Sequence, residues 1–261
     1  MSLNSTQRFT GRVADYVKYR PSYPREIIAF LHDTCGVTPG AQVADIGAGT
    51  GISARLFIEA GHPVVAVEPN QAMREAADAW LGGQDEGLYR SVAGTAEATT
   101  LDAASVDLVI AAQAFHWFDL AKAKREFARI LRPSGRVALF WNSRRLNGSP
   151  FLEGYEALLQ RYGLDYSTVA ERYANDAQMA TWFGNGFLHQ ASFPNHQRLD
   201  LAGLQGRLMS SSYTPEVGHP NDEPMRKALR ELFEQTQHDG VIDLVYDTRI
   251  YVGRVSAAGY Q

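Results

Sequence analysis

The 261-residue chain has one cysteine, Cys35, which excludes an internal disulfide and any metal site with several cysteine ligands. It has no apolar run long enough to span a bilayer, and its first ten residues lack the basic and apolar segments of a signal peptide. Positive charge is not in excess, because the formal net charge is -4, which argues against nucleic acid or an anionic membrane as partner. The histidines show no metal-ligand spacing. We therefore expect a cytoplasmic protein without a metal, monomeric or homodimeric, whose partner is a small-molecule substrate.

Five apolar runs alternate with helix-length amphipathic stretches through the first half of the chain: AQVADIG, HPVVAVE, LYRSVAG, VDLVIAAQ and GRVALFW. This alternation is typical of a parallel sheet covered by helices. Helix starts are marked by Asn70, Asp119 and Ser149. With two more strands expected in residues 192–202 and 240–255, the pattern predicts an α/β fold. The expected fold is a doubly wound, Rossmann-like sheet of seven mostly parallel strands, with helices on both faces and a helical cap insertion.

The chain changes character after residue 143. A predicted helix, FLEGYEALLQRYG, is followed by a polar and aromatic stretch without a strong strand signal up to about Gln190. We predict that residues 1–143 form an N-terminal lid and the ligand-binding core. Residues 144–190 are expected to be the helical cap over the substrate, and residues 191–261 the end of the same sheet.

The stretch VADIGAGTG predicts a strand, a tight turn and the start of a helix. Glycines at positions 47, 49 and 51 allow positive φ angles and a close approach of the backbone to a ligand. The spacing G-x-G-x-G does not match the dinucleotide pattern G-x-G-x-x-G, because Ile52 stands where its last glycine or alanine is required. A Walker-type phosphate loop is also disfavoured, since the turn lacks a lysine followed by serine or threonine. A tight structural turn remains the simple alternative.

Glu68 ends the next apolar run, about 20 residues beyond the glycine turn. In doubly wound folds, a carboxylate at this place accepts hydrogen bonds from ribose hydroxyls. A ribose without a diphosphate points to a nucleoside, and S-adenosylmethionine is a common one. Its amino-acid end would lie along the turn, with Asp45 near the ammonium group. By itself, Glu68 is more often a solvated surface residue, and its separation from the turn is what favours the ligand.

Several segments together resemble the successive motifs of class I S-adenosylmethionine-dependent methyltransferases. These are VADIGAGTG, VEPNQAM, GTAE, VDLVIAAQAFHWFD and LRPSGRVALFW, between Gln42 and Trp141. The N-terminal RFTGRVADYVKYRPSYP together with AFHWFD is similar to the type 11 group that includes trans-aconitate methyltransferase. The resemblance implies S-adenosylmethionine as cofactor and methyl transfer as activity.

The resemblance also implies roles for individual residues. Gly47, Ala48 and Gly49 would line the methionine part, and Gln113 would face the methionine and the transferring methyl. Ala96 would offer its backbone N–H to the adenine, while Thr95 stands where many relatives have an aspartate. The complete set of expected cofactor residues comprises Asp45, Gly47, Ala48, Gly49, Glu68, Pro69, Met73, Ala96, Glu97, Gln113, Tyr16 and Arg20.

The N-terminal DYVKYRPSYP could fold over the ligand as a lid, because Pro21 and Pro24 keep it extended. Arg20 would grip a carboxylate of the methionine or of the substrate through its planar fork. Tyr19 is an expected substrate contact. The alternative is that the tyrosines pack on the next helix and that Arg20 is solvated.

Further substrate contacts are expected from Arg144 or Arg145 after the fifth strand, and from Tyr213. In AFHWFD, His116 is the expected catalytic residue, either as a general base or as a hydrogen-bonding residue. Trp117 and Phe118 are expected to be core residues under the following helix.

The predicted reaction is methyl transfer to a small acceptor, and a carboxylic acid is favoured because it needs no base. Two alternatives stay open. One is a non-catalytic S-adenosylmethionine-binding module, which would carry the same motifs. The other is a nicotinamide-dependent oxidoreductase, which the glycine spacing and the lack of a suitably placed Tyr-x-x-x-Lys pair disfavour.

Overall fold

The computed structural model describes residues 18–83, 87–166 and 176–256. Its centre is a seven-stranded sheet in the order β3-β2-β1-β4-β5-β7-β6. The strands are β1 (Val43–Ile46), β2 (Val64–Val67), β3 (Tyr89–Val92), β4 (Val106–Ala112), β5 (Leu131–Arg144), β6 (Phe187–Leu199) and β7 (Ile242–Gly253). All neighbours pair in parallel except β7, which is antiparallel to both β5 and β6. The predicted Rossmann-like, mostly parallel sheet is confirmed.

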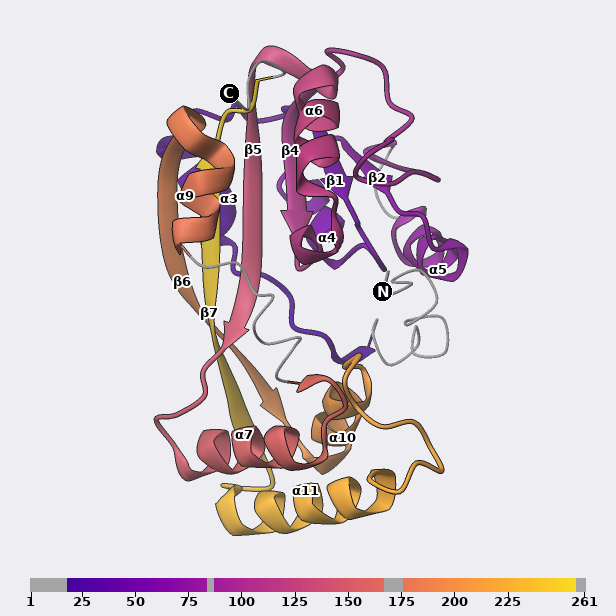
Figure 1. Cartoon of the computed structure of the whole chain (residues 1–261), viewed down its shortest axis with the longest axis vertical. Coiled ribbons are helices and arrows are strands. Elements are labelled where there is room, and N and C mark those ends of the chain that lie inside the picture. Colours follow the sequence, from indigo (N-terminus) through magenta and orange to yellow (C-terminus); the bar gives the residue numbers. More distant parts are fainter. Residues whose placement is uncertain (1–17, 84–86, 167–175, 257–261) are drawn as a thin grey trace.

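Helices cover both faces of the sheet (Figure 1). One face packs against α3 (Glu26–Asp33) and α4 (Ile52–Glu59), and the other against α6 (Leu120–Ile130) and α9 (Asp176–Phe183). Helix α5 (Gln71–Leu81) connects β2 to β3. Alternate residues of β4 serve the two sides, because Leu108 and Ile110 belong to one apolar cluster and Val109 to the other.

The predicted helix starts follow local capping chemistry. The Asn70 side chain accepts from the Met73 N–H at the start of α5, and Asp119 accepts from Lys122 N–H at the start of α6. Ser149 does the same for α7 (Pro150–Tyr162). These caps are confirmed.

A second apolar body lies at one end of the molecule (Figure 1). It is formed by α7, α10 (Leu201–Met209) and α11 (Asp222–Thr236), which pack around the first half of β7. The long strands β6 and β7 therefore join this body to the main sheet. Helix α10 was not predicted, because residues 192–202 suggested a strand continuing beyond Leu199. Asp200 ends that strand by capping α10 through the Gly203 N–H.

The helices predicted as one cap over residues 144–190 lie in two places. Helix α7 packs with α10 and α11, whereas α9 packs beside α6, where the Trp182 indole N–H donates to the Leu120 carbonyl at 3.2 Å. The 144–190 segment also contains the start of β6, at Phe187. Apolar packing of Met179 and Trp182 onto the sheet explains why α9 separates from α7.

Candidate functional site

The glycine turn between β1 and α4 has the backbone shape that only glycine adopts easily. The φ angles of Gly47, Gly49 and Gly51 are 71°, 57° and 86°. A Cβ at Gly47 would lie 2.7 Å from the Cβ of Ala114, so this position also requires the absence of a side chain. The turn is held to β2 because the Gly47 N–H donates to the Val67 carbonyl at 2.9 Å.

Glu68 follows β2 and faces this turn. One carboxylate oxygen accepts from the Gly49 N–H at 2.9 Å, and the other accepts from the Asn70 N–H at 2.9 Å. The residue is only 8% exposed, and burial raises the pKa of Glu68, although both N–H groups counteract this by stabilising the charged form. The side chain is therefore held in one orientation, with lone pairs left to accept from a ligand.

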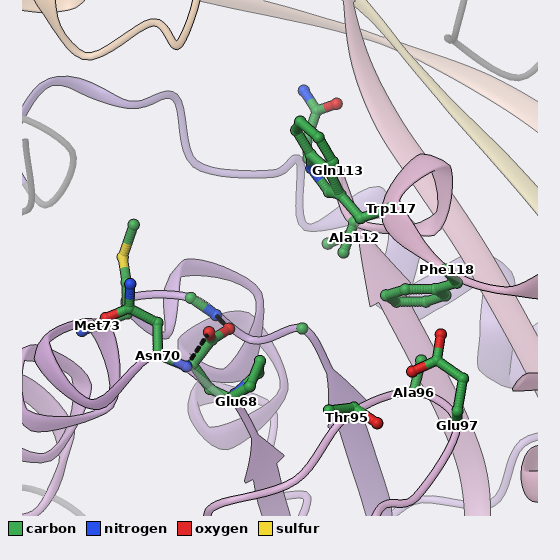
Figure 2. Close-up of a pocket in the computed structure, with 14 residues that line it drawn as sticks. Glu68, Asn70, Met73, Thr95, Ala96, Glu97, Ala112, Gln113, Trp117 and Phe118 are labelled. Carbon is green, nitrogen blue, oxygen red and sulfur yellow. Dashed lines mark hydrogen bonds between the residues drawn. The ribbon is translucent and has the colours of Figure 1, made fainter. Parts of the chain in front are cut away.

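A pocket opens beside Glu68 at the carboxyl ends of β1, β2 and β4 (Figure 2). In this view Met73 and Asn70 lie on one side of Glu68, and Ala96 and Glu97 lie on the other. The described lining residues are Gly47, Gly49, Glu68, Pro69, Asn70, Met73, Thr95, Ala96, Glu97, Ala112, Gln113, Ala114, Trp117 and Phe118. The carboxyl ends of the strands are where open α/β sheets bind their ligands.

Trp117 was expected in the core but is half-buried and lines the pocket, whereas Phe118 packs against the apolar cluster under α6 as expected and lines the pocket as well. Phe118 has a second role, since its ring also packs edge-to-face on Phe127 of α6 at 6.2 Å between centroids. They belong to the turn after β4 that includes the short helix η2 (Phe115–Trp117). This turn follows the end of β4 too closely for all of its rings to be buried under α6.

Gln113 is strained at the end of β4, with a φ of 56°. Its side-chain Nε2 donates to the Asn142 carbonyl at 3.2 Å, while its buried Oε1 accepts from no described residue. The Ala96 N–H likewise has no acceptor within the described ranges. A buried acceptor and a vacant donor at opposite sides of the pocket are groups that a ligand can satisfy.

Asp45, Ala48 and His116 are not among the described residues that line this pocket. Asp45 precedes the last residue of β1 and is fully buried under α4, where it accepts from the Ser53 hydroxyl at 2.6 Å. Burial raises the pKa of Asp45 to about 7, the Ser53 hydrogen bond opposes this, and repulsion from Glu68 adds to it. His116 is half-buried in η2, with its ring 4.8 Å from that of Trp117.

The N-terminal segment runs toward α10 and β6. Arg20 donates to the Ser210 carbonyl at 2.7 Å, and Tyr19 lies so close to Gly206 that a Cβ there would be 2.1 Å from its ring. Residues 19 and 20 thus contact the second apolar body instead of the glycine turn. Tyr16 lies outside the described residues.

Arg144 and Tyr213 also lie in the second body. Arg144 forms an ion pair with Glu156 of α7 and donates to the Tyr166 hydroxyl at 2.9 Å. Tyr213 packs edge-on against Tyr166, with centroids 5.1 Å apart. Arg145 is directed elsewhere, since it pairs with Asp247 at 2.7 Å.

One buried arginine of this region was missed in the sequence. Arg207 of α10 is 7% exposed and donates to the hydroxyls of Tyr246 and Ser211. The available signal was its spacing, because it follows Leu204 by three residues and precedes Leu208 on the apolar face of a helix. An arginine at such a position indicates a buried charge.

Within residues 18–83, 87–166 and 176–256, no helix is long and apolar enough to cross a membrane. No group of three or more histidine, cysteine, aspartate or glutamate side chains in these ranges is arranged to hold a metal ion.

Known proteins match both the sequence and the fold. A family model described as a methyltransferase domain matches residues 44–139. An uncharacterized methyltransferase-like protein of Schizosaccharomyces pombe is 30% identical over 249 residues, which cover 93% of each chain. An uncharacterized methyltransferase of Mycobacterium bovis is 44% identical over 140 residues, or 52% of each chain.

A solved structure is similar over almost the whole chain. It is that of a candidate type II methyltransferase from Anaeromyxobacter dehalogenans, with a TM-score of 0.67 and 23% identity. The match covers 92% of this chain and all of the other. At this identity the likeness shows the fold alone.

Proposed function

The chain belongs to the type 11 group of S-adenosylmethionine-dependent methyltransferases, and we propose that it methylates a carboxylate oxygen of a small-molecule acceptor. The observation that carries the proposal is the composition of the pocket. Among its described lining residues, the only ionisable side chains are Glu68 and Glu97. Glu97 already accepts from the Asp119 N–H at 2.8 Å. The wall thus offers no free base, which suits an acceptor that enters ionised, and the counter-charge for a carboxylate has to come from outside these lining residues.

The residues present fit the cofactor of this family. Glu68 offers lone pairs to the two ribose hydroxyls, and Ala96 offers its N–H to the adenine, beside Met73. The Oε1 of Gln113 would accept from the ammonium group of the methionine part. The absence of a side chain at Gly47 leaves the backbone open to that part. Bound S-adenosylmethionine supplies a methyl group activated by its sulfonium sulfur.

The chain's contribution to the reaction is mainly alignment and exclusion of water. Alignment of two reactants can contribute about 7–11 kcal/mol in favourable cases. Trp117 and Phe118 form the apolar side of the pocket, and an aromatic face also attracts a cationic sulfonium. His116 then acts in shaping the turn after β4 and not as a base.

The cofactor site is tested by Glu68→Gln, because an amide cannot accept from two N–H groups and two hydroxyls in the same orientation. We expect S-adenosylhomocysteine to bind about 5–150-fold more weakly, the equivalent of about 1–3 kcal/mol for a buried group left unpaired. Calorimetry measures the change, and Glu75→Gln on the exposed side of α5 is the matched control. Equal affinity in both variants, or a preference of the wild type for NAD, would contradict the site.

The reaction is tested by a screen of small carboxylic acids, phenols and amines for S-adenosylhomocysteine production by the purified protein. We expect carboxylic acids to be the productive class and His116→Ala to lower kcat only modestly. A loss of about 10²–10⁴-fold in kcat would identify His116 as a general base and overturn the carboxylate acceptor. Binding of the cofactor without turnover of any acceptor would favour the non-catalytic alternative.

A further inference from the structure

The charge of Arg207 is buried without a carboxylate. Its Nε donates to the Tyr246 hydroxyl at 3.1 Å and its Nη1 to the Ser211 hydroxyl at 3.0 Å. Both acceptors are hydroxyl groups, and no aspartate or glutamate of the described residues forms an ion pair with Arg207. A guanidinium cannot lose its proton to avoid the penalty of burial. The molecule therefore holds a buried positive charge for which the described residues supply no counter-charge.

The charge of the neighbouring Arg144 is compensated. Arg144 lies in the same body and pairs with Glu156. Burial acts to raise the pKa of Glu156, but hydrogen bonds from Tyr166 and Arg144 outweigh it and hold the pKa below its usual value. The contrast shows that burial in this body does not by itself prevent pairing with a carboxylate, which makes Arg207 an exception among the described residues.

A buried hydroxyl without a described partner belongs to the same cluster. Tyr155 of α7 is 1% exposed, and its buried hydroxyl has no hydrogen-bond partner among the described residues. Tyr155, Tyr213 and Tyr246 all lie within electrostatic range of the Arg207 guanidinium. An anionic oxygen accepts well from a guanidinium and from a phenolic hydroxyl. One anionic ligand would supply a counter-charge to Arg207 and an acceptor to the Tyr155 hydroxyl.

Hydrogen bonds connect this cluster to the cofactor pocket through the segment after residue 18. On the pocket side, Gln113 donates to the Asn142 carbonyl, and the Asn142 amide donates to the Ser22 carbonyl at 3.1 Å. On the other side, Gln197 donates to the Tyr19 carbonyl at 2.9 Å and accepts from the Tyr246 hydroxyl at 2.8 Å. Residues 19–22 thus have the pocket wall on one side and the Arg207 cluster on the other.

We propose that Arg207, with the hydroxyls of Tyr155 and Tyr213, binds an anionic oxygen group of the methyl acceptor, away from the atom that receives the methyl. The role of this group as part of the acceptor rests on the proposed function. Anion binding itself does not, because it is measured without methyl transfer. Arg207 then determines which acceptors are selected, while the pocket at Glu68 determines the cofactor.

Anion binding is tested by calorimetry on the full-length protein saturated with S-adenosylhomocysteine. The probes are acetate, succinate, benzoate and inorganic phosphate, with succinamide as the uncharged control. We expect at least one anion to bind and succinamide to bind at least tenfold more weakly than succinate. Binding of phosphate alone would support the site and identify a phosphate-bearing acceptor. Failure of the wild type to bind any of the four anions would overturn the proposal.

Variants separate a ligand-binding role from a structural one. Arg207→Met should weaken the binding of the tightest-binding anion at least 30-fold. Arg198→Met, on the exposed side of β6, should leave this affinity unchanged. Removing an uncompensated buried charge should leave the melting temperature unchanged or higher. If Arg207→Met does not fold, Tyr155→Phe removes one hydroxyl and should weaken the anion at least fivefold at unchanged melting temperature. Unchanged anion affinity in the folded variants would overturn the proposal.

Measurement of turnover distinguishes this inference from the proposed function. For an acceptor found by the screen, Arg207→Met should mainly raise KM, with S-adenosylhomocysteine affinity within twofold of the wild type. If turnover does not change in this variant, Arg207 does not bind the acceptor, and the proposed methyl transfer is unaffected. If the variant loses anion affinity but the wild type transfers no methyl group, anion binding by Arg207 is supported and the proposed reaction is refuted.

Discussion

The raised pKa of Asp45, beneath the glycine turn, predicts a pH dependence of the free energy of unfolding that can be measured. Its pKa is raised to about 7 by burial, against 3.8 for the unperturbed side chain. The folded state therefore binds a proton that the unfolded state releases near pH 4. Ionisation of Asp45 therefore lowers the free energy of unfolding. This loss is absent below pH 4, grows as the pH rises, and is complete above pH 7. The difference of about three between the two pKa values corresponds to about 4 kcal/mol.

The variant Asp45→Asn removes the charge and keeps the shape. One oxygen of Asp45 accepts from Ser53, and the other has no described partner, so an amide can keep its oxygen on Ser53. Between pH 5 and pH 8, the free energy of unfolding of the wild type should fall by about 2–3 kcal/mol relative to that of the variant. The variant should be the more stable protein at pH 8. Repulsion between Glu68 and Asp45 helps to raise the pKa of Asp45, so the difference between the two proteins measures Asp45 together with its coupling to Glu68.

Urea unfolding at pH 5, 6, 7 and 8 measures the effect without ligand. Asp200→Asn is the matched control, because Asp200 is exposed and an asparagine can still cap α10. Parallel stability curves for the wild type and Asp45→Asn would refute the reasoning, since Asp45 would then titrate alike in the folded and unfolded states. A variant less stable than the wild type at pH 8 would also refute it.

Two other substitutions test the geometry of the turn and of the second apolar body. Gly47→Ala should destabilise the protein by about 2 kcal/mol or more, because φ is 71° and the new Cβ would lie 2.7 Å from the Cβ of Ala114. Gly61→Ala is the control, because its φ is 82° but its Cβ would meet no atom within 4 Å, and it should cost about 1–2 kcal/mol. Urea unfolding measures both, and equal losses would contradict the close contact. Arg144→Met should lower the free energy of unfolding by about 3 kcal/mol, the lower end of the range for a broken buried pair, because the partly buried Glu156 loses its cation but keeps the hydrogen bonds from Tyr166 and Gln160. The double variant with Glu156→Gln should recover most of this loss. A double variant as unstable as the single one would show that the ion pair is not the cause.

The pocket's main features follow from short stretches of sequence. The three glycines of the turn, the cap at Asn70 and the carboxylate at Glu68 each depend on backbone geometry within a few residues. The parallel order of the strands then brings their carboxyl ends to one edge. Ala96, beyond β3, and Gln113, directly after β4, were expected at the pocket from the resemblance to the methyltransferase motifs, and both line it.

The partners of buried charges could not be predicted in the same way. Asp45 has the sequence position of a ligand-binding residue, but its side chain lies under α4 with Ser53 because it is still inside the strand. Arg144 has the position of a substrate contact and is paired with Glu156.

The sequence alone predicted the fold class, the glycine turn with Glu68 beside it, and the starts of α5, α6 and α7, because periodicity, glycine spacing and caps act over a few residues. Only the tertiary structure decided which charges are neutralised. That depends on how segments far apart in the chain pack together, as where Arg207 of α10 meets Tyr246 of β7. No local pattern records which side chain arrives opposite a buried guanidinium, or that no carboxylate of the described residues does.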